Sequence, residues 1–331
     1  MSDFIREASE HWSQIDPDMS LELQSLGATN HVFRVQSSQT FYLRKYRARD
    51  VVQIQREHEL LQNLSKNLNI IIAPVLTRDD STFCKIGEDF YALFPEAKGT
   101  LIEKDELSEL HAYELGKALA NLHIQLASIT GNDFPTIALS WDKNAWVGRL
   151  EKIIAVIEAN SEFNTNDSVL RRVKQQRDYL ASSKAIHSYT PLTSMQLIHG
   201  DFHHFNVFFA SNCAVSNVID WDLIQNMPAG YDVARACMYI FNMELTRSLV
   251  LLKGYLSVKP LSRFELNDGA KAWAVYADHH VWALEEVFLK KTIPQHKNSY
   301  LKVTLSLLWS NGPKLKVPCL NRYIEMFNNE S

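Results

Sequence analysis

Residues 197–209 read LIHGDFHHFNVFF, so a polar loop lies between two short apolar runs. This pattern predicts a strand, a loop and a second strand. The tip of such a loop ordinarily carries residues that favour turn geometry. Here it carries Asp201, three histidines and Asn206, whose side chains bind protons and metal ions. The segment is therefore a marker of the fold and the first candidate for chemistry.

The N-terminal part of the chain has the pattern of a small sheet around one helix. HVFRVQ and TFYLRKY are β-rich and separated by SSQ, which predicts a hairpin over residues 31–46. Residues 51–68 carry Ile54 and three leucines at helical spacing. TFCKIG and FYALF flank Gly87-Glu88-Asp89 and predict a second hairpin, which ends at Pro95.

Helix dominates from residue 105 onward. Amphipathic stretches of helical spacing lie at 107–126, 143–185, 232–257, 264–291 and 299–310. Two β-rich segments, 197–209 and 214–221, interrupt them. We therefore expect an α+β fold of two lobes, with a small β-rich lobe containing one main helix over residues 1–94 and a larger, mostly helical lobe over residues 95–331. Ligands commonly bind between two such lobes.

Composition excludes several classes of protein. The 331 residues are 46% hydrophobic, enough for one large core or two smaller ones. A net charge of −4 argues against nucleic acid as the main partner, and the basic stretch 44–49 is too short to follow a phosphate backbone. We find no secretion signal and no apolar run of the ~20 residues that span a bilayer. The cysteines are far apart, so neither disulfides nor a zinc cluster is expected and a reducing cytoplasm fits best.

Two acidic motifs carry the chemistry. His199, Asp201 and Asn206 stand in the order H-x-D-x-x-x-x-N, and Asp220 follows fourteen positions after Asn206 within VIDWD. Phosphoryl transfer from a nucleotide needs one carboxylate to hold the acceptor hydroxyl and take its proton. It also needs a second carboxylate and a neutral oxygen ligand to hold Mg²⁺ against the phosphates. The two motifs contain groups of these kinds.

The sequence resembles the aminoglycoside phosphotransferase/choline kinase family, whose members are related to the protein kinases. HGDFHHFN is similar to the catalytic loop of the family, VIDWD to its metal-binding segment, and YDVAR at 231–235 to the helix start that follows. The resemblance covers residues 20–290 and is strongest over 115–235. It implies a protein-kinase-like fold with ATP and Mg²⁺ as cofactors. Three such motifs in the same order seldom arise together by chance.

This resemblance implies a role for each motif residue. Asp201 is expected to be the catalytic base, and Asn206 and Asp220 the Mg²⁺ ligands. His199 is expected to support the loop, and Asp232 to brace it by accepting backbone hydrogen bonds. Asp222 is either a supporting group or a solvated strand end. The neighbouring His203 and His204 do not complete a zinc site, which needs further ligands at recognisable spacing.

The resemblance also implies that the small lobe binds the nucleotide. LGATNHVFRV occupies the position of the phosphate-covering loop but has a single glycine, so Thr29 and Asn30 are expected to supply polar contacts. Arg44 in FYLRKY is expected to contact the phosphates, with Lys45 on the opposite face as the alternative. Glu57 in the following helix is its expected partner. The alternative interpretation of the LGATNHVFRV stretch is an ordinary hairpin turn, and that of Glu57 is a solvated helix surface.

FYALFPEAKG resembles the hinge of the family, where the backbone from Ala92 to Phe94 would bind an adenine edge. Packing within a core strand would also explain these residues. The acceptor is expected to be the hydroxyl of a small metabolite, such as an amino alcohol, a sugar or an aminoglycoside-like compound. Aromatic and acidic residues over 273–286 suit an amine-bearing acceptor, or are simply core. A Ser/Thr protein kinase and a non-catalytic nucleotide-binding module are the alternative functions.

Overall fold

The structure is a computed structural model that describes residues 2–24, 31–46, 50–131, 133–159, 167–242 and 244–291. The chain divides into two compact units. Unit 1 consists of Met1–Glu103 and Phe205–Asp222, and unit 2 of Lys104–His204 and Leu223–Ser331.

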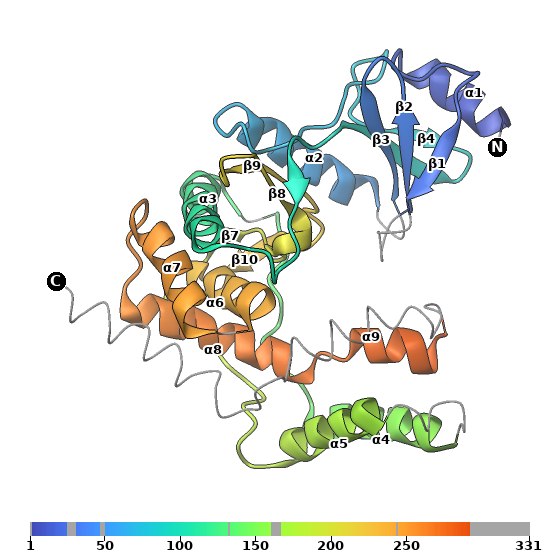
Figure 1. The fold of residues 1–331 in the computed structure, drawn as a ribbon. Helices are drawn as coiled ribbons and strands as arrows, with labels where there is room; N and C mark the ends of the chain where they lie inside the picture. Colours follow the sequence, from blue (N-terminus) through green and yellow to red (C-terminus); the bar gives the residue numbers. More distant parts are fainter. Residues whose placement is uncertain are drawn as a thin grey trace. The chain divides into compact units, whose positions relative to one another are not determined.

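Unit 1 is built on a five-stranded antiparallel sheet, which contains the strands labelled β1 to β4 in Figure 1. The strand order is β1–β2–β3–β5–β4. Its strands are β1 (Leu21–Gln24), β2 (His31–Gln36), β3 (Thr40–Tyr46), β4 (Cys84–Ile86) and β5 (Asp89–Pro95). In the pair β3–β5, Leu43 is opposite Leu93 and Arg44 is opposite Ala92. Successive side chains of a strand point to opposite faces, so this register gives each face of the sheet its own set of residues.

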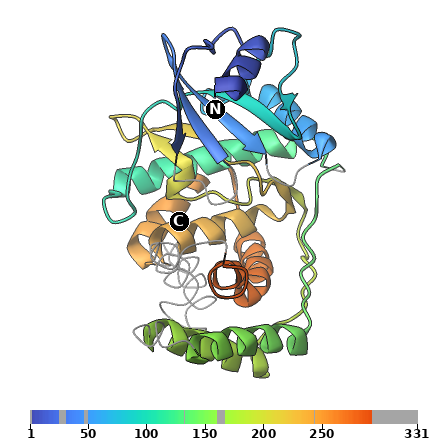
Figure 2. The ribbon, with the colours of Figure 1, turned by 90° about the vertical axis from the view of Figure 1, so that its right-hand side faces the viewer.

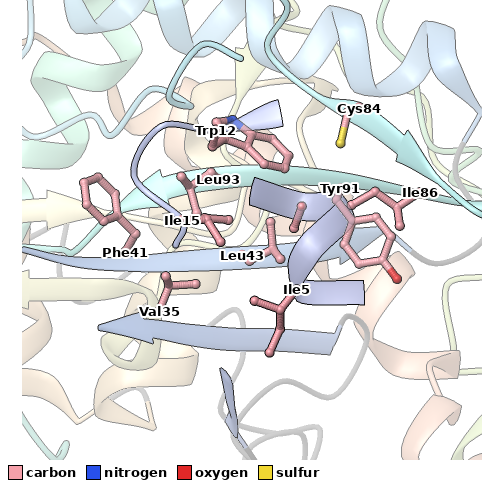
Figure 3. Close-up of a cluster of buried hydrophobic side chains, with 11 residues drawn as sticks. Ile5, Trp12, Ile15, Val35, Phe41, Leu43, Cys84, Ile86, Tyr91 and Leu93 are labelled. Carbon is pink, nitrogen blue, oxygen red and sulfur yellow. The ribbon is translucent and has the colours of Figure 1, made fainter. Parts of the chain in front are cut away.

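Helix α1 (Ser2–His11) packs on one face of the sheet. Its residues Ile5 and Ala8, with Trp12 just beyond the helix, follow the spacing of an apolar helix face. They share a buried core with strand residues that include Val35, Phe41, Leu43, Tyr91 and Leu93 (Figure 3).

Helix α2 (Val51–Ser65) packs on the other face of the sheet, where Ile54 contacts Tyr46 and Ala92. The helix begins after Asp50, whose carboxylate accepts the backbone N–H of Gln53 at 2.8 Å. Arg44 lies two residues before Tyr46 in β3, so its side chain points to the same face as this helix.

A three-stranded sheet attaches residues 205–222 to the N-terminal part of unit 1. Its order is β6–β8–β9, formed by Thr100–Leu101, Val207–Phe209 and Val215–Val218. Asn217 strengthens the attachment, because its side chain accepts the N–H of Lys98 at 2.7 Å and donates to the carbonyl of Ile70 at 3.2 Å.

Unit 2 is mostly helical. Its long helices are α3 (Glu109–Ala127), α4 (Lys143–Ala159), α5 (Asp167–Ala181), α6 (Ala229–Phe241), α7 (Leu245–Leu256) and α8 (Arg263–His279). Helix α3 packs against α7, α6 against α8, and α4 lies beside α5 (Figure 2). A Cβ on Gly269 of α8 would lie 2.2 Å from the backbone of Gly230 in α6, so this close crossing requires glycine. The strands β7 (Gln196–Ile198) and β10 (Gln225–Met227) form an antiparallel pair, and unit 2 also contains the short elements α9 (Trp282–Leu284) and η3 (Glu285–Leu289). The short turn η2 (His204–Asn206) begins with the last residue of the first segment of unit 2 and ends in unit 1.

The expected α+β class and both predicted hairpins are confirmed. The stretch 143–185 forms two helices rather than one continuous element, and so does 232–257, where Asn242 takes a left-handed conformation with φ of 50° and ends α6. The helix expected over 299–310 lies outside the described residues. Among the residues that the structure describes, no helix is long and apolar enough to cross a membrane.

Candidate active site

The loop after β7 is held by a buried carboxylate from α6. Asp232 accepts the backbone N–H of His199 at 2.9 Å and that of Gly200 at 3.0 Å. The ring Nδ1 of His199 lies 3.2 Å from the backbone nitrogen of Asp201 and accepts its N–H. The side chains of Asp232 and His199 are fully buried. The bracing role expected for Asp232 and the supporting role expected for His199 are confirmed.

Gly200 is required by the path of this loop. Its φ is 77°, in the left-handed region that glycine tolerates best. A Cβ at this position would lie 2.1 Å from the carbonyl oxygen of Leu223. The loop therefore passes close to the segment before β10, and that approach fixes the backbone that carries Asp201.

Asp201 forms an ion pair with Arg235 of α6, one turn after Asp232. The Arg235 guanidinium is buried, with 6% of the residue exposed, and lies over the Tyr239 ring at 4.1 Å. The Nε2 of His203 lies 3.5 Å from the other carboxylate oxygen of Asp201, and the His203 ring stacks on Tyr239 at 6.1 Å. The predicted base thus sits within a cluster of charged and aromatic side chains in unit 2.

The charges in this cluster stabilise one another. Burial opposes ionisation of Asp201, but the Arg235 charge, followed by the hydrogen bond from His203, outweighs it and holds the pKa of the carboxyl well below its usual range. Burial likewise opposes the charge of Arg235, and Asp201 raises the pKa of the guanidinium above its usual value. The carboxylate is therefore ionised at neutral pH.

The other two predicted oxygen ligands belong to unit 1. Asn206 ends the short turn η2 and is buried. The backbone carbonyl oxygen of Asn206 accepts the N–H of Ile219 at 2.9 Å, which links Asn206 to the residue before Asp220. Asp220 has a φ of 62°, an uncommon conformation for a residue other than glycine, and 38% of its side chain is exposed.

This donor set suits magnesium. An amide and a carboxylate are hard oxygen donors, and Mg²⁺ usually binds one or two carboxylates together with substrate phosphates and water. Among the described residues, no three His, Cys, Asp or Glu side chains form a group that could hold a metal ion. A metal at Asn206 and Asp220 would therefore depend on phosphate oxygens to complete its coordination.

Arg44 gathers three carboxylates in unit 1. Its Nη1 lies 3.3 Å from Glu57 of α2, and its Nη2 pairs with Asp222 and lies 3.8 Å from Asp220. Burial opposes its charge, but Asp222 first, then Glu57 and Asp220, raise its pKa well above the usual value. Arg44 is therefore a permanent cation next to one of the predicted metal ligands.

Lys45 points to the opposite face of β3, as strand alternation requires, and pairs with Asp89 at 2.5 Å. Thr29 and Asn30, expected to contact the phosphates, lie outside the described residues. Ala92 and Phe94 lie within β5 and pair with β3, and the carbonyl of Leu93 between them accepts the N–H of Val75 at 2.8 Å. Their binding to an adenine edge stays a prediction.

The structure decides between two pairs of alternatives that the sequence left open, and it adds one pairing that was not expected. Asp222 is a partner of Arg44 and not a solvated strand end. Arg235 was noted only as part of YDVAR, although it pairs with Asp201. Within 273–286, Trp273 and Asp278 are buried, and Asp278 accepts the hydroxyl of Tyr179 at 3.0 Å. For these two residues the alternative interpretation, that they belong to the core, is confirmed.

The chain was compared with known proteins. The family model of the phosphotransferase enzyme family matches residues 20–255. A homoserine kinase from Rhizobium etli is 28% identical over 218 residues, which cover 62% of this chain and 61% of that protein. The chain thus matches less than two thirds of the length of this relative.

Solved structures with the same fold are more distant in sequence. A spectinomycin phosphotransferase in complex with ADP and spectinomycin has a TM-score of 0.66 at 16% identity, with 97% of both chains covered. A microcompartment-associated aminopropanol kinase has a TM-score of 0.56 at 17% identity, covering 92% of this chain and 95% of that one. These likenesses confirm the expected protein-kinase-like fold. From its catalytic-loop motif, its fold and the match over residues 20–255, the chain belongs to the phosphotransferase enzyme family.

Proposed function

We propose that the protein is an ATP- and Mg²⁺-dependent kinase that transfers the γ-phosphoryl group to the hydroxyl of a small metabolite. In this proposal residues 1–94 bind the nucleotide, and residues 95–331 carry the catalytic loop and the acceptor site. The observation that carries the proposal is the ionised Asp201, fixed on a braced loop five residues before Asn206. A protein that only binds nucleotide has no need of such a base.

In the proposed reaction Asp201 accepts the hydroxyl hydrogen bond of the acceptor and takes its proton. The hydroxyl oxygen forms a bond to the γ-phosphorus, the bond to the β,γ-bridging oxygen breaks, and ADP leaves. Arg44 binds phosphate oxygens, which requires that they replace Asp222 or Asp220 beside its guanidinium. A magnesium ion at Asn206 and Asp220 would neutralise phosphate charge.

The acceptor is proposed to be small. The relative from Rhizobium etli is described as a homoserine kinase, and a structure with the same fold as an aminopropanol kinase. Homoserine, aminopropanol and ethanolamine are therefore the first acceptors to test, followed by sugars and aminoglycosides. We place the enzyme in a reducing compartment such as the cytoplasm, since the described cysteines, Cys84, Cys213 and Cys237, are all thiols.

The test is ADP release with each acceptor, together with ³¹P NMR of the product. Asp201→Asn and Asp220→Asn should lower kcat by a factor of roughly 10³ or more, since each removes a group that acts in the transition state. Asp178→Asn, at an exposed position of α5, is the matched control and should leave kcat unchanged. If the Asp201→Asn variant keeps more than a tenth of the activity, Asp201 is not the base.

A Ser/Thr protein kinase is the second candidate, because its fold class is the same. It predicts phosphate incorporation into protein in cell extracts and no turnover with metabolites. Autophosphorylation without any small-molecule acceptor would favour it over the function proposed here.

A further inference from the structure

Arg235 is a buried cation with unused hydrogen-bonding capacity. Its Nη2 pairs with Asp201, and the face of its guanidinium lies over Tyr239. Its Nη1 is buried and has no hydrogen-bond partner in the described part of the chain. Buried donors in native proteins are almost always satisfied, so such a group calls for an explanation. A bound anion is the strongest explanation, because a guanidinium can donate hydrogen bonds to carboxylates from two nitrogens at once.

We propose that Arg235 binds a carboxylate of the acceptor through Nη1, and thereby selects small hydroxy acids over neutral or cationic alcohols. The proposal rests on the function proposed above, since it names the class of acceptor for the same site. Arg235 is then a specificity-determining residue that contacts the substrate while it stays paired with the base.

Geometry limits the size of the acceptor. Asp201 and the proposed carboxylate would bind two nitrogens of a single guanidinium, and hydrogen bonds are about 3 Å long. The hydroxyl held by Asp201 and the carboxylate held by Arg235 must therefore lie a few bonds apart in one molecule. A short hydroxy acid or hydroxy amino acid meets this requirement. A dianionic phosphate meets it less well, because Asp201 would repel it more strongly.

The protein itself shows that such sharing is stable. In unit 1, Arg44 pairs with Glu57 through Nη1 and with Asp222 through Nη2. The proposal gives Arg235 the same arrangement, with the substrate supplying the second carboxylate. Tyr239 contacts Arg235, Tyr276 and His280 interact with it electrostatically, and all three residues are only partly buried. The proposal requires that one of these side chains move to admit the anion.

The first experiment uses acceptors that differ only in the carboxylate. L-Homoserine is compared with 3-amino-1-propanol, 4-hydroxybutyrate with 1-propanol, and glucuronate with xylose. We expect the wild type to have a KM lower by a factor of roughly 30 or more for the acid of at least one pair. Arg235→Met should bring that ratio close to 1, through a rise in KM for the acid, while Arg235→Lys should restore part of it.

The second experiment measures binding without turnover. The thermal shift of the protein with 2-aminobutyrate, which is homoserine without its hydroxyl, is compared with that of propylamine. The melting temperature of the wild type should rise with 2-aminobutyrate but not with propylamine, and Arg235→Met should lose this shift. Because Arg235→Met also removes the partner of Asp201 and could unfold the protein, Tyr239→Leu serves as a second variant. It keeps the ion pair, removes the stacking ring and should weaken the preference for acids.

The outcomes separate this inference from the proposed function. Turnover of an amine or neutral alcohol at a KM equal to that of its acid partner overturns the inference and supports the kinase. Binding of the acid without turnover of any acceptor supports the role of Arg235 and counts against the kinase. Absence of both an acid-dependent shift and acid turnover overturns the inference.

Discussion

Removal of the Arg44 charge should destabilise unit 1 far more than removal of any one of its partners. Arg44 is the cation for three carboxylates, those of Glu57, Asp222 and Asp220. In Arg44→Met all three lose that cation at once. In Glu57→Gln the arginine keeps the other two carboxylates and loses one hydrogen bond of 3.3 Å.

The magnitudes follow from burial. The Glu57 side chain is 3% exposed and that of Asp222 is 18% exposed, so water replaces little of the lost interaction. Removing one partner of a buried ion pair costs about 3–5 kcal/mol. Glu57→Gln should cost only about 1 kcal/mol, because it loses one hydrogen bond but also removes a carboxylate that is costly to bury. Arg44→Lys keeps the charge and should lie between the two.

Hydrogen exchange read by mass spectrometry is the suitable assay, since two units need not unfold together. Peptides from β3 and α2 report on unit 1, and peptides from α3 and α7 serve as the internal control. Since ~1.4 kcal/mol is a factor of ten, Arg44→Met should speed exchange in β3 and α2 by a factor of roughly 10² to 4 × 10³. Glu57→Gln should speed it by a factor of about 5.

The asymmetry is what tests the reasoning. Equal acceleration by Arg44→Met and Glu57→Gln would mean that Asp222 and Asp220 contribute nothing to holding the arginine. Acceleration by less than a factor of five in Arg44→Met would mean that its carboxylates are solvated once the cation is gone. Either result would refute the account of Arg44 as a shared cation.

Three further outcomes are expected. Asp232→Asn should lower the free energy of unfolding of unit 2 by about 2–4 kcal/mol, measured by hydrogen exchange in peptides from β7 and α6. The reason is that an amide NH₂ would then face one of the two backbone N–H groups that now donate to the carboxylate. Arg235 lowers the folded-state pKa of Asp201, so the contribution of this carboxylate to stability is fully present above the unfolded pKa of about 3.9 and is lost as the pH falls further. The free energy of unfolding should therefore not change through Asp201 between pH 7 and pH 5. A loss of stability in that range that disappears in Arg235→Met would contradict the assignment. Burial raises the pKa of Cys84 and of Cys237 to about 12, so iodoacetamide at pH 8 should leave both thiols unmodified in the native protein and modify them in urea, as peptide mass spectrometry would show.

Local patterns in the sequence predicted the elements that depend on local interactions. The hairpin over residues 31–46 follows from alternation and a polar turn, whereas the braced loop was implied by the resemblance to the family. Helix α1 was missed because it is short and polar on average, and its apolar residues gain meaning only against the sheet. The Ile5, Ala8 and Trp12 spacing was the signal that could have revealed it.

The pairings of charged residues could not be predicted from local patterns, and the one that was expected, Arg44 with Glu57, came from the resemblance to the family. Asp222 and Arg44 are separated by 178 positions, and Arg235 and Asp201 by 34. Nothing in the local pattern around an Asp distinguishes a solvated carboxylate from one that meets a distant arginine. Strand alternation did place Arg44 and Lys45 on opposite faces, but it gave no account of which carboxylates each would meet.

The choice of arginine at both positions has a physical reason. Each guanidinium has to satisfy more than one group from a buried position: Arg44 reaches Glu57 and Asp222 through different nitrogens, and Arg235 pairs with Asp201 while its face rests on Tyr239. A lysine ammonium is a compact, strongly hydrated charge without a planar face and would lose more hydration in either place. An arginine at position 44 therefore fits a site in which one cation pairs with several carboxylates, and in the proposed function phosphate oxygens compete with them for it.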